Sequence, residues 1–372
     1  MSTDNAHSLS DSYNVQIGGS PKKLMTNLYG LEIDILRELE THWKDVYRYI
    51  TSFLTSQGVE ELTAKEIAIL PGMELISGLF HIWRYYQTKE YDVVIIDTAP
   101  TADTLRLLSF PDAIEWYYTR FFGITRKVVK AARVTVGKVM KTPLPDDKVF
   151  TSFHEIYTRL KKVKELLTDP LITTVRLVLN PEKMVINETQ RAFTYLSLYG
   201  FTVEALILNR VHPESLKGTY LHSMVDSQIE NKKIIDECFP SVKIFEVPTY
   251  NFEIIGINAL KVLADNLFSS DPTKIYSNHN PVKFFSEKGY NYVKIFLPFL
   301  ETMDFNVYTK SDLLIIDIGN MRRVIHLPTG LINKQIISAT YEKEYLTIKF
   351  EGEKYDTKEK KGKTEKRENN MQ

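Results

Sequence analysis

Asp97 is the residue of this sequence that most directly suggests chemistry. It ends the segment YDVVIIDTAP, in which Val93 to Ile96 form a short apolar run of mostly β-branched residues. Such a run predicts a strand that is buried on both faces, as in a parallel sheet. In nucleotide-binding α/β folds an acid at this point lies beside the phosphates and holds Mg²⁺, directly or through water. The alternative is an acid that caps a helix on a structural loop.

A second group of side chains combines aromatic rings with positive charge. Residues 120–148 contain eight Lys or Arg and two Asp, a net charge of +6. Five aromatic residues lie at or just before the start of this stretch: Trp116, Tyr117, Tyr118, Phe121 and Phe122. Such a surface suits an apolar segment of a partner protein, here called the client, that is flanked by acidic or phospholipid groups. These five residues are therefore the candidate client-binding residues. The alternative is a solvated basic face over an internal aromatic cluster.

Composition narrows the class of protein. The 372 residues are 43% hydrophobic and 25% charged, which are ordinary globular values. Lys+Arg and Asp+Glu both number 47, so the net charge is zero and we expect no nucleic-acid partner, although a local patch can hide in such a balance. No apolar run approaches the roughly 18 residues of a membrane span, and residues 1–14 are too polar for a secretory signal. We therefore expect a cytoplasmic protein.

The hydrophobic pattern predicts the elements that position these residues. Spacings of three and four predict an amphipathic helix from about Leu28 to Leu54, and a second helix after Pro71-Gly72 to about Tyr86. Strands are expected at 93–96, 173–181, 203–211 and 241–248, with helices over about 182–199, 213–237 and 252–268. This alternation predicts right-handed βαβ crossovers and an α/β fold with a doubly wound, mostly parallel sheet. Ligands of such sheets bind at the carboxyl ends of the strands.

The remaining segments define the domain boundaries. Residues 1–268 form the α/β domain, and about 112–150 is expected to be a helical insert in it. The turn-rich stretch 269–285 is expected to be a linker. Period-two alternation over 286–352 predicts five short strands and a small β-sandwich, and the highly charged residues 353–372 predict a disordered tail.

Several long phrases resemble one family. DTAPTADTLRLLSFP (97–111) resembles switch II of the ArsA family of ATPases, and MSTDNAHSLSDSYN (1–14) resembles its switch I. EIAILPGM (66–73), LVLNPEKMVINETQRAFTYLSLYG (177–200) and LILNRV (206–211) are similar to bacterial and archaeal members. The family includes arsenical-pump-driving ATPases and ATPases that target tail-anchored membrane proteins. The resemblance covers roughly residues 1–270 and implies a P-loop NTPase fold of the deviant Walker A, MinD/ArsA-like type.

The resemblance also implies roles for individual residues, with ATP and Mg²⁺ as cofactors. Asp4 corresponds to the acid that positions or activates the attacking water. Asp97 corresponds to the acid that holds Mg²⁺, most often through a water molecule. Asn209, Val247 and Pro248 correspond to positions that frame the adenine base. The single switch II implies a homodimer whose two active sites meet across the interface. The region equivalent to 112–150 lines the groove that receives a transmembrane helix in the targeting ATPases.

The sequence departs from the family pattern at three points. Ala102 and Asp103 replace the usual Gly-His of switch II, and Asp103 is interpreted as a helix cap. Asn5 replaces the usual proline, so we expect a looser switch I. The phosphate loop, G-K-G-G-V-G-K-T in type, precedes switch I in the family, and no G-x-x-x-x-G-K-[ST] sequence occurs in residues 1–372. We interpret this as a chain truncated at an internal methionine rather than a natural loss of nucleotide binding.

Three functions follow as hypotheses. The leading one is an ATPase that opens and closes a dimeric client-binding surface for membrane-protein targeting or chaperoning. The second is an ATPase that drives an arsenite or antimonite pump. One cysteine, Cys238, argues against it, because a metalloid site needs several thiolates. The third is a nucleotide-independent chaperone or binding module, suggested by the resemblance of the C-terminal strands to the α-crystallin domain of small heat-shock proteins. There Glu344 replaces the usual glycine before the last strand.

Overall fold

The computed structural model describes residues 1–3, 8–34, 44–68, 73–98, 147–300, 304–319 and 321–352. The chain divides into two compact units, Met1–Asn280 and Pro281–Gln372, and each is described here by itself. The expected insert, apart from its last four residues, and the expected C-terminal tail lie outside the described residues. None of the helices in the described ranges is long and apolar enough to cross a membrane.

A β-hairpin replaces the start of the first expected helix. β1 (Lys22–Met25) pairs antiparallel with β2 (Leu28–Gly30), and Asn27 has a φ of 61° in the turn between them. The prediction of a helix from Leu28 is therefore wrong. The spacing of three between apolar residues arises there by coincidence, because the strand and the later helix α3 (Lys44–Ser56) are read as one periodic segment. Asn27 tolerates the left-handed conformation that the turn requires.

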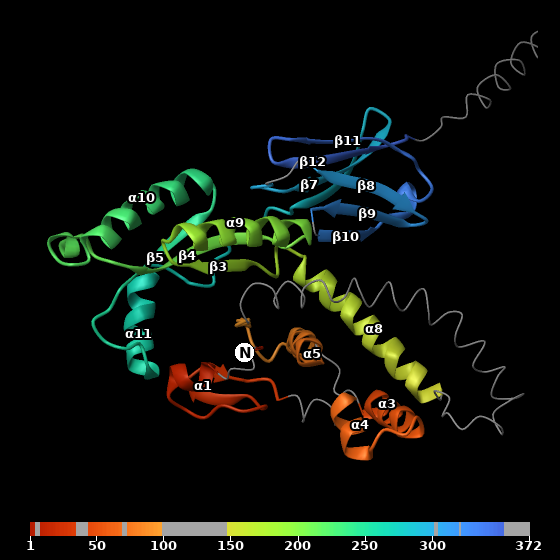
Figure 1. Ribbon diagram of the computed structural model, residues 1–372, viewed down its shortest axis with the longest axis horizontal. Helices are drawn as coiled ribbons and strands as arrows, with labels where there is room; N and C mark the ends of the chain where they lie inside the picture. Colours follow the sequence, from red (N-terminus) through yellow and green to blue (C-terminus); the bar gives the residue numbers. More distant parts are fainter. Residues whose placement is uncertain are drawn as a thin grey trace, which may run out of the picture. The chain divides into compact units, whose positions relative to one another are not determined.

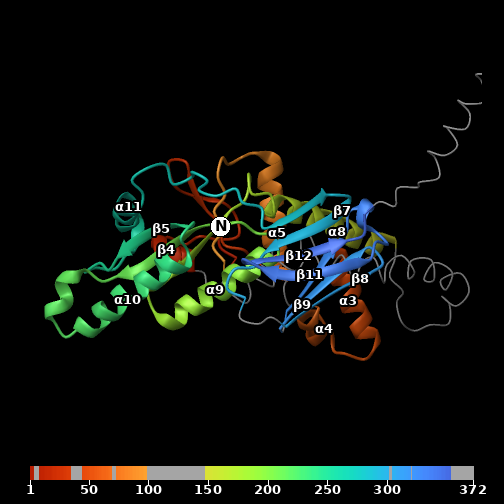
Figure 2. The ribbon, with the colours of Figure 1, turned by 90° about the horizontal axis from the view of Figure 1, so that it is seen from above.

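Several helices of the first unit pack against one another. The described helices are α1 (Ser8–Tyr13), α3, α4 (Glu61–Ile67), α5 (Met73–Thr88) and α8 (Asp147–Leu167). α8 contacts both α3 and α5, and α3 contacts α4 (Figure 2). Leu160 and Val163 of α8 and Leu79 of α5 are fully buried at these contacts. The helix expected to end near Tyr86 is thus confirmed as α5.

The parallel sheet is built as the alternation predicts. β3 (Val175–Leu179), β4 (Val203–Val211) and β5 (Lys243–Pro248) pair in that order, all parallel. Figure 1 shows the helices that connect and follow them: α9 (Lys183–Leu198), α10 (His222–Cys238) with the short η2 (Glu214–Gly218), and α11 (Gly256–Leu267). Since α9 contacts β3 and β4, Leu206 and Leu208 of β4 are almost fully buried. The α/β class with a parallel sheet is confirmed.

The segment Val93–Ile96 differs from the expected doubly buried strand. Asp97 forms a parallel bridge with Ser2, but Val93 and Ile95 are 50% and 75% exposed. Within the described ranges only residues 1–3 pair with this segment. A strand becomes buried when neighbours cover both faces, and the β-branched run by itself does not supply these neighbours.

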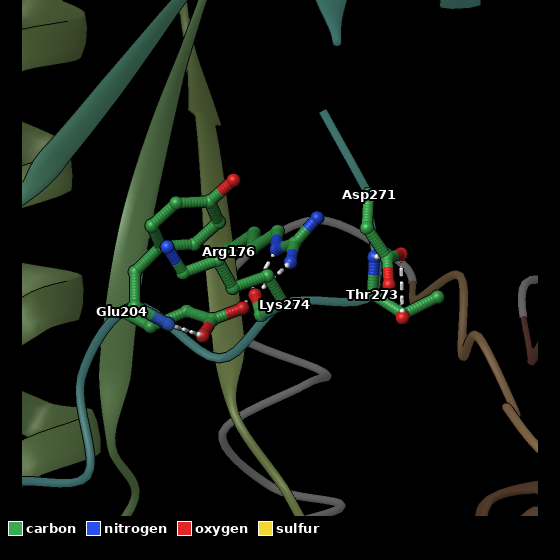
Figure 3. Close-up of polar contacts among 6 residues, drawn as sticks. Arg176, Glu204, Asp271, Thr273 and Lys274 are labelled. Atoms are coloured by element: carbon green, nitrogen blue, oxygen red, sulfur yellow. Dashed lines mark hydrogen bonds and ion pairs between the residues drawn. The ribbon is translucent and has the colours of Figure 1, made fainter. Parts of the chain in front are cut away.

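Residues 269–280, the first part of the expected linker, are bound to the parallel sheet. Glu204 of β4 is 2% exposed, and its carboxylate accepts hydrogen bonds from Arg176 Nε at 2.7 Å and from the Tyr276 backbone N–H at 2.8 Å. Arg176 also donates to the Lys274 carbonyl at 3.2 Å (Figure 3). A buried carboxylate needs such partners to offset its desolvation. Residues 269–280 therefore form a strap on the first unit.

Aromatic rings and local turns complete this strap. The Arg176 guanidinium lies 5.9 Å from the ring centroid of Phe268 and 5.8 Å from that of Tyr276, and Phe245 contacts both rings edge to face. Asp271 accepts hydrogen bonds from the Thr273 backbone N–H and hydroxyl, which lower the pKa of the Asp271 carboxyl. The Arg176 guanidinium thus contacts two rings and a buried acid, and these contacts anchor the strap at Lys274 and Tyr276.

The second unit is a β-sandwich of two antiparallel sheets, shown as stacked layers in Figure 1. One sheet has the order β11-β12-β7-β6 and the other β10-β9-β8. The strands are β6 (Val282–Glu287), β7 (Tyr290–Phe296), β8 (Phe305–Lys310), β9 (Leu313–Ile318), β10 (Met321–His326), β11 (Ile336–Glu342) and β12 (Tyr345–Phe350), with η3 (Thr329–Leu331) before β11. Fully buried side chains such as Ile295, Ile316 and Ile348 form its core.

Five of these strands were expected, and β6 and β11 were not. β6 begins at Val282, within the stretch that was expected to be a linker. Both lie at the edges of the four-stranded sheet, where most side chains are exposed on either face. Edge strands therefore lack the clean alternation that identifies a half-buried strand in the sequence.

We predict that Glu204→Ala lowers the free energy of unfolding by about 3 kcal/mol, because it leaves the half-buried Arg176 charge without its partner. The strap 269–280 is expected to become sensitive to limited proteolysis. Glu246→Ala is the matched control: Glu246 pairs with Lys232 at 2.7 Å, but its side chain is 46% exposed. That pair is expected to contribute less than about 1 kcal/mol. Equal effects of the two variants in urea unfolding contradict the assignment of Glu204 as the anchor.

Candidate functional site

Asp97 is held beside the first residues of the chain by backbone hydrogen bonds. The Asp97 N–H donates to the Met1 carbonyl at 2.8 Å, and the Thr3 N–H donates to the Asp97 carbonyl at 2.9 Å. The Thr3 hydroxyl donates to the same carbonyl at 3.2 Å. The pairing is parallel, so both segments end at the same edge. The Asp97 carboxylate is exposed at this edge.

Ser2 lies between two parallel neighbours. It bridges to Asp97 on one side and to Glu32 on the other, with the Ser2 N–H donating to the Leu31 carbonyl at 2.8 Å. Ser2 and Thr3 are almost fully buried. Gly78 of α5 allows this packing, since a Cβ at Gly78 would lie 2.9 Å from the Thr3 methyl carbon. The segment is thus fixed by two neighbouring backbones and one helix.

Glu32 connects this array to α1. Its carboxylate is 2% exposed and accepts two hydrogen bonds of 2.7 Å, from the backbone N–H and the hydroxyl of Ser10. The Ser10 Oγ in turn accepts from the Ile17 N–H at 2.9 Å. Hydrogen bonds to an ionised acceptor are stronger than neutral ones. The end of the stretch that resembles switch I is therefore fixed by one buried acid.

Asp4, the predicted water-activating acid, lies outside the described residues. So do the predicted client-binding residues Trp116, Tyr117, Tyr118, Phe121 and Phe122. The structure describes both ends of the segment that contains Asp4: Thr3, tied to Asp97, and α1, which begins at Ser8. The roles of Asp4 and of the five aromatic residues stay predictions.

The three predicted base-framing residues come together at the carboxyl ends of β4 and β5. Val211 pairs with Pro248, and the register between Leu208 and this pair is irregular. Asn209 lies in that irregularity, next to Arg210 with its φ of 56°. Asn209 is half-buried, Val247 is 9% exposed and Pro248 is exposed. A bulge of this kind re-aims side chains at the end of a strand.

Gln228 of α10 fixes the loop that follows Asn209. This side chain is 4% exposed and forms hydrogen bonds with both backbone groups of His212, accepting from N–H at 2.7 Å and donating to C=O at 3.0 Å. The Thr249 N–H donates to the Val211 carbonyl at 2.9 Å, and the Thr249 Oγ1 lies 3.1 Å from His212 Nδ1. The loops after β4 and β5 are therefore held side by side.

Asp97 and the base-framing loops belong to different parts of the first unit, and a helix pair links those parts. α1, which Glu32 anchors, contacts α11, which follows the β5 loop. α11 begins at Gly256, whose φ of 81° lies in the left-handed region that glycine adopts without strain. α1 is therefore in direct contact with the helix that follows the β5 loop.

The donor chemistry at Asp97 fits Mg²⁺ held through water. Mg²⁺ keeps several waters and uses one or two carboxylates together with substrate phosphates. A single exposed carboxylate, on a segment that backbone hydrogen bonds hold to residues 1–3, meets that need. Within the described residues, no three His, Cys, Asp or Glu side chains gather as a protein-only metal site.

Glu32 and Gln228 were not identified in the sequence as functional. Glu32 stands in the run LYGLEID, where an acid among apolar neighbours signals a buried, hydrogen-bonded carboxylate. The sequence prediction assigned this run to an amphipathic helix and did not single out Glu32. Gln228 lies in a polar stretch of α10 and carries no comparable signal.

Comparison with known families decides the identity. The family model described as "Anion-transporting ATPase", of ArsA type, matches residues 1–269. The chain belongs to this family. A second model, described as "HSP20-like domain found in ArsA", matches residues 288–350 and corresponds to the sandwich. The P-loop NTPase class of the first unit and the resemblance of the C-terminal strands are thereby confirmed.

Named relatives include both branches of the family. The "Putative arsenical pump-driving ATPase 1" of Aquifex aeolicus (strain VF5) is 36% identical over 359 residues, which are 94% of this chain and 91% of the relative. A protein of Chlorobaculum tepidum named "Putative arsenical pump-driving ATPase" is 35% identical over 358 residues, 95% and 88% of the two chains. The "ATPase GET3C" of Arabidopsis thaliana is 27% identical over 292 residues, 71% and 73% of the two chains.

We predict that Glu32→Gln loosens α1. The two carboxylate oxygens accept hydrogen bonds from the Ser10 N–H and hydroxyl. In the amide, one of these oxygens is replaced by an NH₂ group, which donates and cannot accept. The expected loss of local stability is about 2 kcal/mol. It is measured as faster hydrogen exchange at the Ile17 amide, which donates to Ser10 Oγ. Asp11→Asn is the control, since Asp11 is exposed on the same helix. Unchanged protection of Ile17 in the Glu32 variant excludes the anchoring role.

Proposed function

We propose that this chain is an ArsA-family ATPase that acts as a homodimer in the cytoplasm. ATP binding and hydrolysis are coupled to a conformational change that opens and closes a client-binding surface. The client is a hydrophobic segment of a membrane protein or a membrane partner, so the activity is membrane-protein targeting or chaperoning. The family membership, the anchored switch I stretch and the paired loops after β4 and β5 support this proposal.

Each residue group has one task in this proposal. Asn209, Val247 and Pro248 frame the adenine base, Asp97 holds Mg²⁺ through water, and Asp4 positions or activates the attacking water. Phosphoryl transfer depends mainly on positioning and charge neutralisation, so two acids beside the metal and the γ-phosphate are suitable equipment. Mg²⁺ supplies the neutralisation of phosphate charge when bound.

The observation that carries the coupling is the connection from Glu32 to α1 and on to α11. A change at the γ-phosphate that moves the switch I stretch acts on α1, because Ser10 is held by Glu32. α1 contacts the helix that follows the base-framing loop, so nucleotide state and base position are mechanically linked. This is the arrangement that a nucleotide-dependent conformational change requires.

A metalloid-pump function is the second candidate, and the names of the relatives favour it. Cys238 is half-buried, and its Sγ accepts a hydrogen bond from Gln190 Nε2 at 3.2 Å. One such thiol in the sequence is too few for a metalloid site within one chain. Stimulation of ATP turnover by arsenite distinguishes the two functions.

A nucleotide-independent chaperone or binding module is the third candidate, and the HSP20-like sandwich favours it. Suppression of client aggregation that is equal with and without ATP distinguishes this candidate from the ATPase.

ATP turnover by this machinery requires a phosphate-binding loop, and residues 1–372 contain no G-x-x-x-x-G-K-[ST] sequence. We expect no turnover by residues 1–372, and turnover by a chain lengthened upstream of Met1 in the genomic reading frame to include such a loop. In the lengthened chain, Asp97→Asn and Asp4→Asn are expected to lower kcat by at least about a hundredfold and to spare nucleotide binding. The matched control is Asp92→Asn, an exposed acid five residues before Asp97.

Two results contradict this part of the proposal. One is a reading frame without a phosphate loop upstream of Met1. The other is wild-type turnover in the Asp97 or Asp4 variant, which removes that residue from the mechanism.

We further expect that changing Phe121 and Phe122 together to Asp abolishes capture of a hydrophobic helix in a pull-down. Two charges in the aromatic cluster oppose burial of an apolar client. Phe252→Asp is the control, because Phe252 is 48% exposed and lies outside residues 112–150. Circular dichroism verifies that the double variant is folded. Unchanged capture, or loss of the fold in the double variant, removes the support for a client groove at this segment.

A further inference from the structure

The four-stranded sheet of the second unit has one face in the core and one face turned away from it. Strand register assigns the side chains, since paired residues share a face and neighbours along a strand alternate. Val293 of β7 pairs with Phe284 and Ile348, and Val293 and Ile348 are fully buried in the core. The residues on either side of Val293 along β7, Tyr292 and Lys294, therefore belong to the opposite, outer face.

Aromatic rings gather on this outer face. Phe285, Tyr290, Tyr292, Phe296 and Tyr345 all belong to it by register. Phe285 and Tyr292 are stacked, with ring centroids 5.1 Å apart and an interplanar angle of 11°. Phe285 and Tyr290 are 40% and 38% exposed. We name these five residues the aromatic face. Rings on the outer face do not contribute to the core of the sandwich, so core packing does not explain why they are there.

Lysines stand among these rings. Lys349 Nζ lies 3.6 Å from the ring centroid of Tyr290, and Lys294 Nζ lies 4.1 Å from that of Tyr345. Lys283 pairs with Lys294 on the same face and is exposed. In the part of the chain that the structure describes, no carboxylate lies within 4.0 Å of these three ammonium groups. Their charge is held beside the rings and remains available to an anion.

The acidic residues of the outer face stand at its two ends. Glu287 pairs with Tyr290 at the start of β7, and its carboxylate lies 3.8 Å from Lys288 Nζ. Glu342 pairs with Tyr345 near the opposite end of β7. The middle of the face therefore combines aromatic rings with positive charge alone.

We propose that the aromatic face binds single-stranded nucleic acid. Bases stack on aromatic side chains irrespective of sequence, and lysines between the rings contact the phosphates. A peptide that adds as a strand uses the edge backbones of β6 or β11 rather than an outer face, and an apolar helix has no use for the lysines. The proposal goes beyond the ATPase activity and does not depend on it.

The zero net charge of the chain is consistent with a local site of this kind. It excludes strong long-range attraction, so we expect binding in the micromolar range at low salt, typical of non-specific contacts. The expectation of no nucleic-acid partner followed from the total charge. The register of the sheet shows a local concentration of rings and lysines that the total charge hides.

The test uses the full chain and a fluorescein-labelled oligonucleotide of about 15 thymidines. Fluorescence anisotropy gives the Kd as a function of salt. We expect binding that is at least about tenfold weaker for an abasic strand with the same phosphates, since base stacking is then lost. The double variant Phe285→Ala with Tyr292→Ala is expected to bind about tenfold more weakly or worse. Tyr220→Ala is its control, because Tyr220 is 89% exposed and lies in the first unit.

A second pair of variants tests the charge and keeps the rings. Lys283→Ser with Lys294→Ser is expected to weaken binding and to reduce the slope of log Kd against log salt by about 1. Lys310→Ser, an exposed lysine of β8, is the control. The thermal midpoint of each variant verifies that the sandwich is folded. If the Phe285/Tyr292 variant does not fold, the affinity of the Lys283/Lys294 variant and the affinity for the abasic strand still test the proposal.

Four results overturn the proposal. They are the absence of binding at high micromolar concentration, equal affinity for the abasic strand, affinity unchanged in both sandwich variants, and displacement of the oligonucleotide by an acidic peptide of equal charge at equal affinity. The third result assigns the binding to the basic stretch 120–148, and the fourth assigns the face to acidic peptides.

Discussion

The buried carboxylate of Glu32 is the constraint on which the N-terminal part of the first unit depends. A carboxylate at 2% exposure is stable only with hydrogen bonds, and Glu32 accepts two from Ser10. Ser10 cannot satisfy Glu32 unless α1 lies against the end of the β2 segment. The Ser2 bridge then places residues 1–3 between Glu32 and Asp97. One acid therefore fixes a helix, a chain segment and the neighbour of the predicted metal-associated residue.

Glu204 imposes the same constraint at the other end of the first unit. Its partners are Arg176 on the adjacent strand and the backbone of Tyr276, a hundred residues along the chain from Arg176. Because the buried acid is satisfied only when the strap is in place, the strap belongs to the first unit and the chain leaves that unit at Asn280. β6 of the second unit then begins at Val282.

The sequence predicted the parallel sheet because each strand there is a short stretch rich in apolar residues that a helical period follows, as at VEALILNRV. It failed where structure depends on partners distant in the chain. Leu28 was assigned to a helix because the Asn27 turn was not recognised, and Ile95 was expected to be buried although burial depends on neighbours. The resemblance implied a shared role for Asn209, Val247 and Pro248, and the structure brings them together at the ends of β4 and β5. Glu32 and Gln228 could not be identified from the sequence, because their roles depend on the helices that they contact.

The predicted site therefore rests on two layers of residues with different demands. Asp4 and Asp97 are predicted to take part in the chemistry because they are acids, and such residues tolerate little change in charge. Glu32 and Gln228 form hydrogen bonds with Ser10 and His212, so a replacement at either position must keep the shape and the hydrogen-bonding groups of the side chain. α1 and α11 join the layers, and coupling between two binding events is reciprocal. In the proposed nucleotide site, the contact between α1 and α11 couples the position of α1 to base binding near Pro248, and the coupling acts in both directions.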